Sequence, residues 1–225
     1  IGFWPANSDK DDIILFNNDK RNSKLAIFHT IRQQASHSTD RPNYALADFI
    51  APLSKNKKIK DYIGGFALTC GHGENELSEK FKRDSDDYNS IMTKALADRL
   101  AEAFAERMHE RVRKEFWGYS PKENFNNDAL IKEKYSGIRP AHGYPAQPDH
   151  TEKGKLFEIL EATKNIDVSL TESFSMLPGA SISGLYFSNP KSNYFGVGKI
   201  SKDQVKDYAK RKSMTLMECE KWLMP

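Results

Sequence analysis

The stretch from residue 137 to residue 153 reads GIRPAHGYPAQPDHTEK and is the most informative part of this chain for its fold and use. Prolines at positions 140, 145 and 148 fix the backbone φ angle and remove amide donors. Gly143 permits a positive φ or a close approach of a ligand to the backbone. With so many conformationally restrictive residues together, we expect a loop that holds one shape.

Two side chains of this loop are suited to ligand binding. Arg139 offers a planar guanidinium to a carboxylate or phosphate, and Tyr144 offers a ring and a hydroxyl. Taken alone, an arginine in a loop is more often half of a surface ion pair. The residue types by themselves therefore leave both interpretations open.

The chain has 225 residues, of which 29% are charged, and a formal net charge of +3. No Gly/Ser or Pro linker divides it, so we expect one domain. Opposite charges are interspersed without a basic block, so nucleic acid is not expected as a partner. The densest cationic cluster, with lysines at positions 55, 57, 58 and 60, is typical of a solvated loop.

Cysteine usage and hydropathy indicate the cellular setting. Cys70 and Cys219 lie far apart and match no metal-ligand spacing, which fits a reducing cytoplasm and predicts neither a zinc site nor a disulfide framework. No apolar run approaches the ~18 residues needed to cross a bilayer, and there is no signal peptide, so no membrane partner is expected. Neither Gly-x-Gly-x-x-Gly nor a Walker motif is present, so no Rossmann site or P-loop is predicted.

The order of hydrophobic patterns predicts an α+β domain with a mostly antiparallel sheet. Strands are expected at residues 12–16, 62–69, 168–174, 182–187 and 194–200. The glycine pair at positions 64 and 65 indicates a bulge or a close backbone contact in its strand. Helices are expected at residues 23–34, 128–135 and 152–163, and two more begin in the capping boxes SKDQ (201–204) and TLME (215–218).

One long amphipathic helix is predicted over residues 86–116. Large apolar side chains recur there every four positions: Met92, Leu96, Leu100, Phe104, Met108, Val112 and Phe116. Such stripes are normally buried, so these side chains are expected in the core. Glu102 lies about 200° around the helix from Leu100, which places it away from the predicted core stripe.

Several segments together point to one known family. The loop at 137–153 is followed by LTESFSMLPGASISG at 170–184, and further matches lie in the same order at residues 44–52, 94–106, 109–114 and 203–209. Over nearly its whole length the chain closely resembles the S-adenosylmethionine-binding activation domain of cobalamin-dependent methionine synthase. The resemblance implies a single curved domain around a twisted, mostly antiparallel sheet flanked by helices. It would span residues 1–225 and lack its N-terminal part.

The resemblance also implies a role as part of a methyltransferase. In that family, flavodoxin or an equivalent reductase delivers an electron to inactive cob(II)alamin, and S-adenosylmethionine then methylates cob(I)alamin. A neighbouring module carries the cobalamin, and this chain lacks that module's usual Asp-x-His-x-x-Gly signature. Alone, the chain is expected to bind the methyl donor and turn nothing over.

By resemblance, the ligand-binding signature Arg-x-x-x-Gly-Tyr stands here as Arg139, Gly143 and Tyr144. Arg139 is expected to bind the carboxylate of S-adenosylmethionine. The backbone of Ala141 is available to the adenine or to the amino-acid end of the ligand.

Two aromatic and two acidic residues complete the expected site. Tyr194 and Phe195 would enclose the adenine or shield the methyl group from water. The family usually has two tyrosines there, so any hydrogen bond from the second hydroxyl is lost at Phe195. Glu102 and Glu133 are candidate partners for the ammonium or the ribose, with a solvated glutamate as the alternative for each.

Three further residues of the loop receive no chemical role. Gln147 stands where relatives commonly carry cysteine. His142 and His150 are interpreted as structural or surface residues, because methyl transfer to cobalt removes no proton from the nucleophile. No catalytic residue and no metal ligand are expected.

Two alternative functions remain open. The chain could be a separate reactivation subunit of another corrinoid methyltransferase. It could also be a non-catalytic docking module whose ligand site has decayed, for which Gln147 and Phe195 are the only indications in the sequence.

Overall fold

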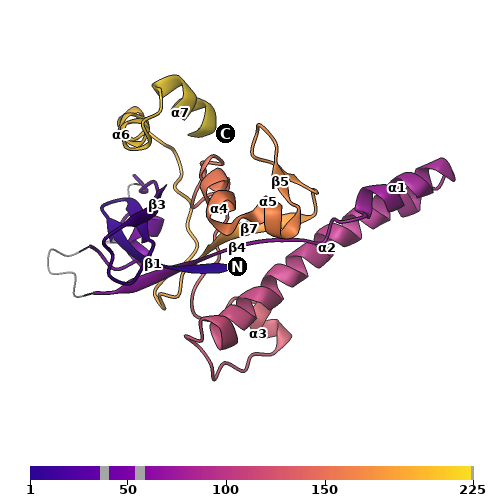
Figure 1. The fold of residues 1–225 in the computed structure, drawn as a ribbon, viewed down its shortest axis with the longest axis horizontal. Helices are drawn as coiled ribbons and strands as arrows, with labels where there is room; N and C mark the ends of the chain where they lie inside the picture. Colours follow the sequence, from indigo (N-terminus) through magenta and orange to yellow (C-terminus); the bar gives the residue numbers. More distant parts are fainter. Residues whose placement is uncertain (36–40, 54–58, 224–225) are drawn as a thin grey trace.

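Five strands form one antiparallel sheet, in the order β3-β2-β1-β4-β7, in the computed structural model, which describes residues 1–35, 41–53 and 59–223 (Figure 1). They are β1 (Gly2–Asp9), β2 (Asp12–Phe16), β3 (Lys24–His29), β4 (Asp61–Thr69) and β7 (Ser181–Tyr186). A second sheet pairs β5 (Ser169–Leu170) with β6 (Met176–Leu177). The α+β class and the antiparallel sheet are confirmed, whereas the lysines at positions 55, 57 and 58 lie outside the described residues.

The main core lies between the sheet and α4 (Glu152–Leu160), where Leu156 packs with Ile63 of β4 and Leu185 of β7. Gly65 makes this close approach possible, because a Cβ built there would stand 2.7 Å from Leu156 Cδ1. The strand expected at residues 62–69 is thus confirmed, and its glycine pair marks a close contact.

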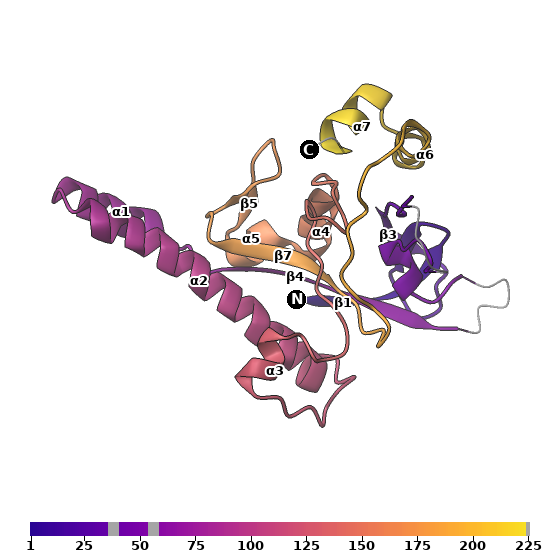
Figure 2. The same cartoon turned by 180° about the vertical axis from the view of Figure 1, so that it is seen from behind.

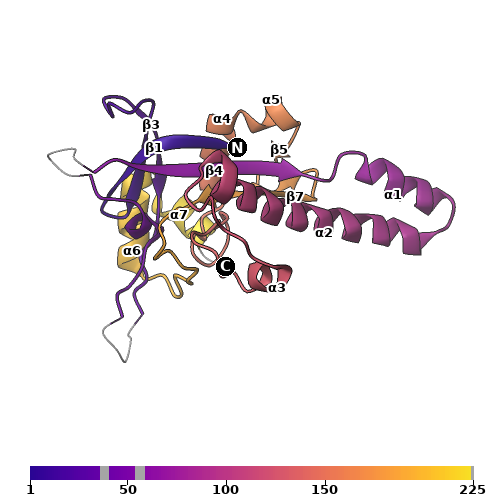
Figure 3. The ribbon, with the colours of Figure 1, turned by 90° about the horizontal axis from the view of Figure 1, so that it is seen from below.

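Apart from α4 and α5 (Ala162–Ile166), which lie over the sheet, most helices are at two ends of the domain. At one end α1 (Glu74–Arg83) and α2 (Asp87–Arg111) form a projecting arm, and a π-helical turn, Val112–Phe116, extends α2 toward α3 (Asn127–Ile131) (Figure 3). At the other end lie α6 (Lys202–Lys212) and α7 (Leu216–Leu223) (Figure 2). A 3-10 turn also forms at Leu46–Phe49.

Local capping signals predicted the two C-terminal helices correctly. Ser201 and Gln204 form the capping box of α6, and the backbone amide of Thr215 donates to Glu218 Oε2 at 3.0 Å before α7. The expected helix at residues 152–163 is instead broken at Glu161, whose φ of +48° separates α4 from α5. The expected helix at 128–135 and strand at 168–174 are shorter in the structure, as α3 and β5.

The helix predicted at residues 23–34 is wrong, because this segment contains strand β3. Its backbone pairs with β2 in the register Ile14 to Ile27. The three apolar residues at helical spacing have separate environments: Leu25 is exposed, Phe28 joins the main core, and Ile31 packs with the C-terminal helices. The i, i+3 spacing therefore does not mark one buried helical face here.

The strand predicted at residues 194–200 is also wrong. This segment forms no strand and instead makes separate hydrogen bonds to loops, from Val197 N to Pro145 O (2.8 Å) and from Gln33 Nε2 to Gly196 O (2.7 Å). It crosses the ligand loop at residues 137–153 and so cannot join the sheet ladder.

The long helix is confirmed, but the prediction of its buried face is wrong. Leu96, Leu100 and Phe104 are 54%, 60% and 40% exposed. The side chains that face the sheet are small, namely Ala97, Ala101 and Ala105. Alanines let α2 approach β4 and β7 closely, and the predicted stripe reaches the core only near its C-terminal end, where Val112 is buried and Met108 packs against the same cluster.

This correction predicts opposite sensitivities for two neighbouring positions of α2. Leu100→Gln is expected to change the free energy of unfolding by no more than about 0.5 kcal/mol, because the side chain is exposed. Ala101→Leu is expected to cost about 1–3 kcal/mol, because the larger side chain overpacks the contact with the sheet. Urea denaturation of both variants measures the difference. A larger loss for Leu100→Gln than for Ala101→Leu would show that the predicted stripe is the buried face.

Candidate functional site

A cavity of about 740 Å³ opens between α2, the ligand loop and the segment that leads into β7. Phe66 of β4 lies on its sheet side, and Met176 and Ile182 line the side nearest the β5–β6 hairpin. The lining combines apolar, aromatic and charged groups, as expected of a site for a small ligand with an apolar body and charged ends.

Six of the eight expected site residues line this cavity: Glu102, Arg139, Ala141, Tyr144, Tyr194 and Phe195. Gly143 lies in the same loop behind the lining residues and shapes the loop. Glu133 is exposed just beyond α3 and is not among the lining residues. The structure therefore brings together residues from α2, the loop and the 194–195 segment, which are far apart in sequence.

Arg139 is held in a fixed orientation at the cavity wall. Its Nη2 donates to Glu106 Oε2 and its Nη1 to the Tyr135 hydroxyl, both at 2.7 Å. Its backbone amide donates to the hydroxyl of Tyr194 at 3.0 Å. Burial alone would lower the pKa of Arg139, but Tyr135 and Glu106 raise it above its usual value, so the guanidinium stays charged.

A buried histidine supports Arg139 from behind. His109 Nδ1 lies 3.3 Å from Arg139 Nη1, and the imidazole stacks on Tyr186 with ring centroids 5.1 Å apart. Burial, with the charges of Arg113 and Arg139, lowers the pKa of His109 well below its usual range. The ring is therefore neutral, and Nδ1 can accept a hydrogen bond from the guanidinium.

The π-helical turn after α2 places Arg113 in this support. Its guanidinium forms two hydrogen bonds to Glu123, at 2.7 and 2.8 Å, and stands 3.8 Å from the ring centroid of Tyr135. Because Tyr135 in turn contacts Arg139, the turn fixes the base of the ligand-facing arginine. Nothing in the sequence pattern indicated this turn, although single π turns often occur at functional sites.

The ligand loop has the fixed shape that its prolines and glycine predicted. The amide of Gly143 donates to Gln147 O at 2.7 Å, and that of Gln147 donates back to Tyr144 O at 2.8 Å. Gly143 has a φ of +88°, and a Cβ there would stand 2.1 Å from the imidazole of His150. Only glycine is compatible with both the backbone conformation and the adjacent ring.

Glu102 faces the cavity because the buried face of α2 differs from the predicted one. Since α2 packs through Ala101 and Ala105, the adjacent Glu102 points along the side of the helix that borders the cavity, together with Asp98. The helical-wheel argument was drawn from Leu100, which is exposed. The alanines at positions 97, 101 and 105 are the sequence signal that would have predicted the buried face of α2 and, with it, the position of Glu102 beside the cavity.

Several other lining residues were not singled out from the sequence. Asp98 and Arg99 come from α2, and Lys153 lies at the end of the loop in the first turn of α4, with its ammonium donating to Phe174 O at 2.7 Å. Burial lowers the pKa of Lys153. The segment from Gly179 to Ser183 also lines the cavity, and it belongs to one of the stretches that carried the family resemblance.

His142 borders the cavity as a buried, neutral side chain. It is 2% exposed and stacks on Phe28, with ring centroids 5.6 Å apart. Burial lowers its pKa from 6.5 to about 4, although Glu152 and Asp149 act in the opposite direction. The structural interpretation of His142 therefore fits its environment better than a surface position does.

Protonation of His142 is expected to destabilise the domain in acid. Between pH 6.5 and about 4 the unfolded chain binds a proton that the folded domain excludes. The contribution to stability is full above pH 6.5 and falls as the pH drops, by at most about 3 kcal/mol. In His142→Phe this part of the pH dependence should vanish, which urea denaturation from pH 7 to pH 4 measures. Parallel curves for the variant and the original chain would contradict the prediction.

The described residues form neither a metal-binding cluster nor a membrane-spanning helix. Within residues 1–35, 41–53 and 59–223, no group of three or more His, Cys, Asp or Glu side chains is placed to hold a metal ion. No helix in the same part of the chain has the length and apolar character required to cross a membrane.

Comparisons with known proteins show what the whole chain is similar to. The family model described as "Vitamin B12 dependent methionine synthase, activation domain" matches residues 1–213. The chain is also similar to a solved structure described as "Crystal Structure of the MetH Reactivation Domain bound to AdoHcy", with 54% sequence identity and a TM-score of 0.95. That similarity covers 100% of this chain and 68% of the other. Every residue that lines the cavity lies within both matches.

Proposed function

The chain belongs to the family of vitamin B12-dependent methionine synthase activation domains, and we propose that it binds S-adenosylmethionine in the cavity between α2 and the ligand loop. The observation that carries this proposal is Arg139, whose oriented guanidinium lines a cavity large enough for the whole ligand. The similar solved domain was crystallised with AdoHcy, which is S-adenosylmethionine without its transferable methyl group.

The charged groups of the cavity complement the two ends of S-adenosylmethionine. Arg139 binds the carboxylate through its planar fork of donors. Glu102 and Asp98 lie on the α2 side, where their negative charges stabilise the ammonium and the positively charged sulfonium. Glu133 lies outside the cavity lining, so we assign it no contact with the ligand.

Aromatic side chains fit the remaining parts of the ligand. Tyr194 is fixed by its hydrogen bond from the backbone of Arg139, and Phe195 packs against Tyr44 and Phe49 of the core. Tyr144 is exposed at the cavity mouth. These rings offer stacking surface to the adenine and exclude water around the methyl group.

The contribution of this chain to the reaction is positioning rather than acid-base catalysis. When bound to a neighbouring module, the corrinoid supplies the reduced cobalt that accepts the methyl group. The S–CH3 bond of the ligand breaks with its electron pair left on sulfur, and S-adenosylhomocysteine remains in the cavity. Arg139 and the acidic side chains of α2 would hold the charged ends of the ligand and thereby orient its sulfonium.

The finer assignments follow from the family. We infer that the full enzyme is methionine synthase, that the partner is its cobalamin-binding module, and that flavodoxin or an equivalent protein donates the electron. On this basis the isolated chain binds the methyl donor without transferring its methyl group.

Isothermal titration with S-adenosylmethionine, S-adenosylhomocysteine and ATP tests the proposal. Saturable binding of the first two, without binding of ATP, is the expected result. A folded sample that binds neither sulfur ligand would contradict it and favour the docking module with a decayed site.

A further inference from the structure

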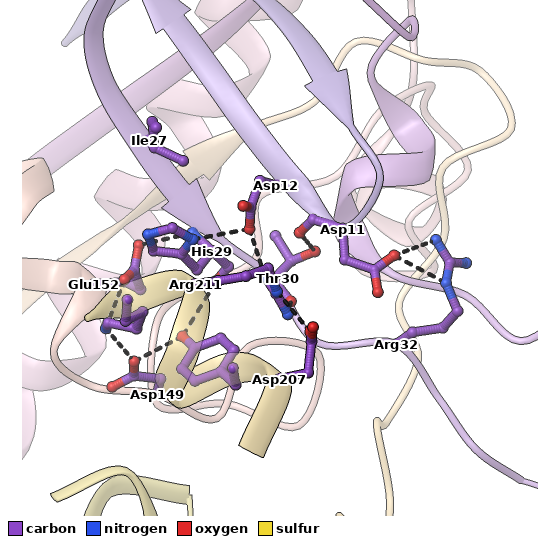
Figure 4. Close-up of polar contacts among 12 residues, drawn as sticks. Asp11, Asp12, Ile27, His29, Thr30, Arg32, Asp149, Glu152, Asp207 and Arg211 are labelled. Carbon is purple, nitrogen blue, oxygen red and sulfur yellow. Dashed lines mark hydrogen bonds and ion pairs between the residues drawn. The ribbon is translucent and has the colours of Figure 1, made fainter. Parts of the chain in front are cut away.

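A network of buried polar and charged side chains connects residues 149–152 with the end of β3 and with α6; Figure 4 labels His29, Asp149 and Glu152 among its members. We call it the anchor network and define it as His29, Asp149, Glu152, Tyr208 and Lys212. It joins the end of β3, the end of the ligand loop and α6. None of its five members is among the residues that line the cavity.

Lys212, in the last turn of α6, is the cation of this network. Its ammonium lies 2.5 Å from Asp149 Oδ2 and 2.7 Å from Glu152 Oε1, and it also contacts the hydroxyl of Thr151. The lysine side chain is only 6% exposed, and both carboxylates are buried. These three partners lie between the lining residues Ala146 and Lys153 in the sequence.

His29 connects the network to the interior of the loop. Its carbonyl oxygen accepts from Gln147 Nε2 at 2.7 Å and from the Tyr208 hydroxyl at 3.3 Å. The hydroxyl of Tyr208 also lies 2.7 Å from Asp149 Oδ2, and the backbone amide of His29 donates to Glu152 Oε2 at 3.1 Å. The loop is therefore attached to α6 both through Asp149 and through His29.

We propose that Lys212 and Tyr208 are positioning residues for the ligand loop, so that docking of α6 and binding of S-adenosylmethionine stabilise each other. This inference rests on the proposed function. Through Asp149 and Gln147, α6 fixes the backbone from which Arg139 and Tyr144 reach the ligand. By linkage, a ligand that requires the ordered loop also strengthens the docking of α6.

Charge balance explains why the loop depends on Lys212. Without the ammonium, Asp149 would be a buried carboxylate without a cation, whereas Glu152 would keep Lys155 at 2.9 Å. A buried charge that loses its partner is strongly destabilising. Movement of residues 149–152 toward water would hydrate the carboxylate again and lower this free-energy cost. Such a movement would displace Gly143 and Gln147, whose mutual hydrogen bond closes the loop.

The test compares Lys212→Met with Lys210→Met, a matched control at an exposed lysine of the same helix. Amide hydrogen exchange of the ligand-free domain is followed at Gly143 and Gln147, and affinity for S-adenosylmethionine is measured by calorimetry. We expect Lys212→Met to speed both exchange rates and weaken binding by about ten-fold or more, since small displacements at a ligand site are costly. The control should change each quantity by less than about two-fold.

Tyr208→Phe keeps the test decisive if circular dichroism shows that Lys212→Met does not fold. This variant retains the buried ring and loses only the hydroxyl contacts to Asp149 and His29, and smaller changes in the same direction are expected. Unchanged exchange at Gly143 and Gln147 in a folded variant would overturn the inference, whether or not the ligand binds. Failure of the unaltered chain to bind S-adenosylmethionine would instead contradict the proposed function.

Discussion

Replacing Arg139 with alanine is expected to weaken S-adenosylmethionine binding by about 100-fold or more, while the domain stays folded. Arg139 lines the cavity with its guanidinium already oriented by Tyr135 and Glu106, so the substitution removes a preorganised set of donors. The loss would remove the partner of the ligand carboxylate and leave the negative charge of Glu106 near it.

Calorimetry of three variants separates this role from a general effect of charge. Arg107→Ala removes an exposed arginine of α2 that pairs with Glu110 outside the cavity, and it should leave affinity unchanged. Arg139→Lys keeps the charge but not the planar fork, so affinity should fall between those of the alanine variant and the unaltered chain. An Arg139→Ala protein that binds as tightly as the control would remove Arg139 from the site.

The largest effect on stability is expected at Arg113. Its side chain is fully buried and pairs with Glu123, which is 4% exposed. Arg113→Met would leave that carboxylate buried without its cation and remove the contact with the Tyr135 ring. We expect a loss of about 3–5 kcal/mol in the free energy of unfolding, because breaking a buried pair exposes the full cost of burying one charge.

Thermal denaturation measures the loss at Arg113 against a neighbouring pair. For a domain of this size the melting temperature should fall by about 6–20 °C. Arg111→Met is the matched control, because Arg111 pairs with Glu115 on the exposed side of the same helical segment, and it should cost no more than about 1 kcal/mol. Equal losses in the two variants would show that burial does not increase the contribution of the Arg113–Glu123 pair to the free energy of unfolding.

Where a local interaction decides the structure, the sequence was sufficient. The capping boxes at Ser201 and Thr215 satisfy backbone donors within four residues, so α6 and α7 begin where the sequence predicts. The shape of the ligand loop follows from its prolines and from Gly143, whose backbone conformation few other residues adopt. Six of the expected site residues also line one cavity, because the resemblance carried their relative placement with it.

Where two segments compete for the same surface, only the tertiary structure was decisive. Leu25 and Phe28 have the spacing of a helical face, yet β3 forms because its backbone can pair with β2. The residues around Tyr194 have the composition of a strand, yet they cross the ligand loop and find their hydrogen bonds there. The spacing of apolar residues indicates which side chains can be buried together. It does not indicate which other segment will form hydrogen bonds with the backbone.

The long helix shows this division within one element. Its amphipathic sequence by itself determined that residues 87–111 are helical, because helical hydrogen bonds form within the segment. The tertiary structure decided which face is buried: the sheet accepts Ala101 and Ala105 at short range, so Leu100 points to solvent and Glu102 to the ligand cavity. Secondary structure depends on neighbours along the chain, whereas the buried face depends on the shape of the surface that the helix meets.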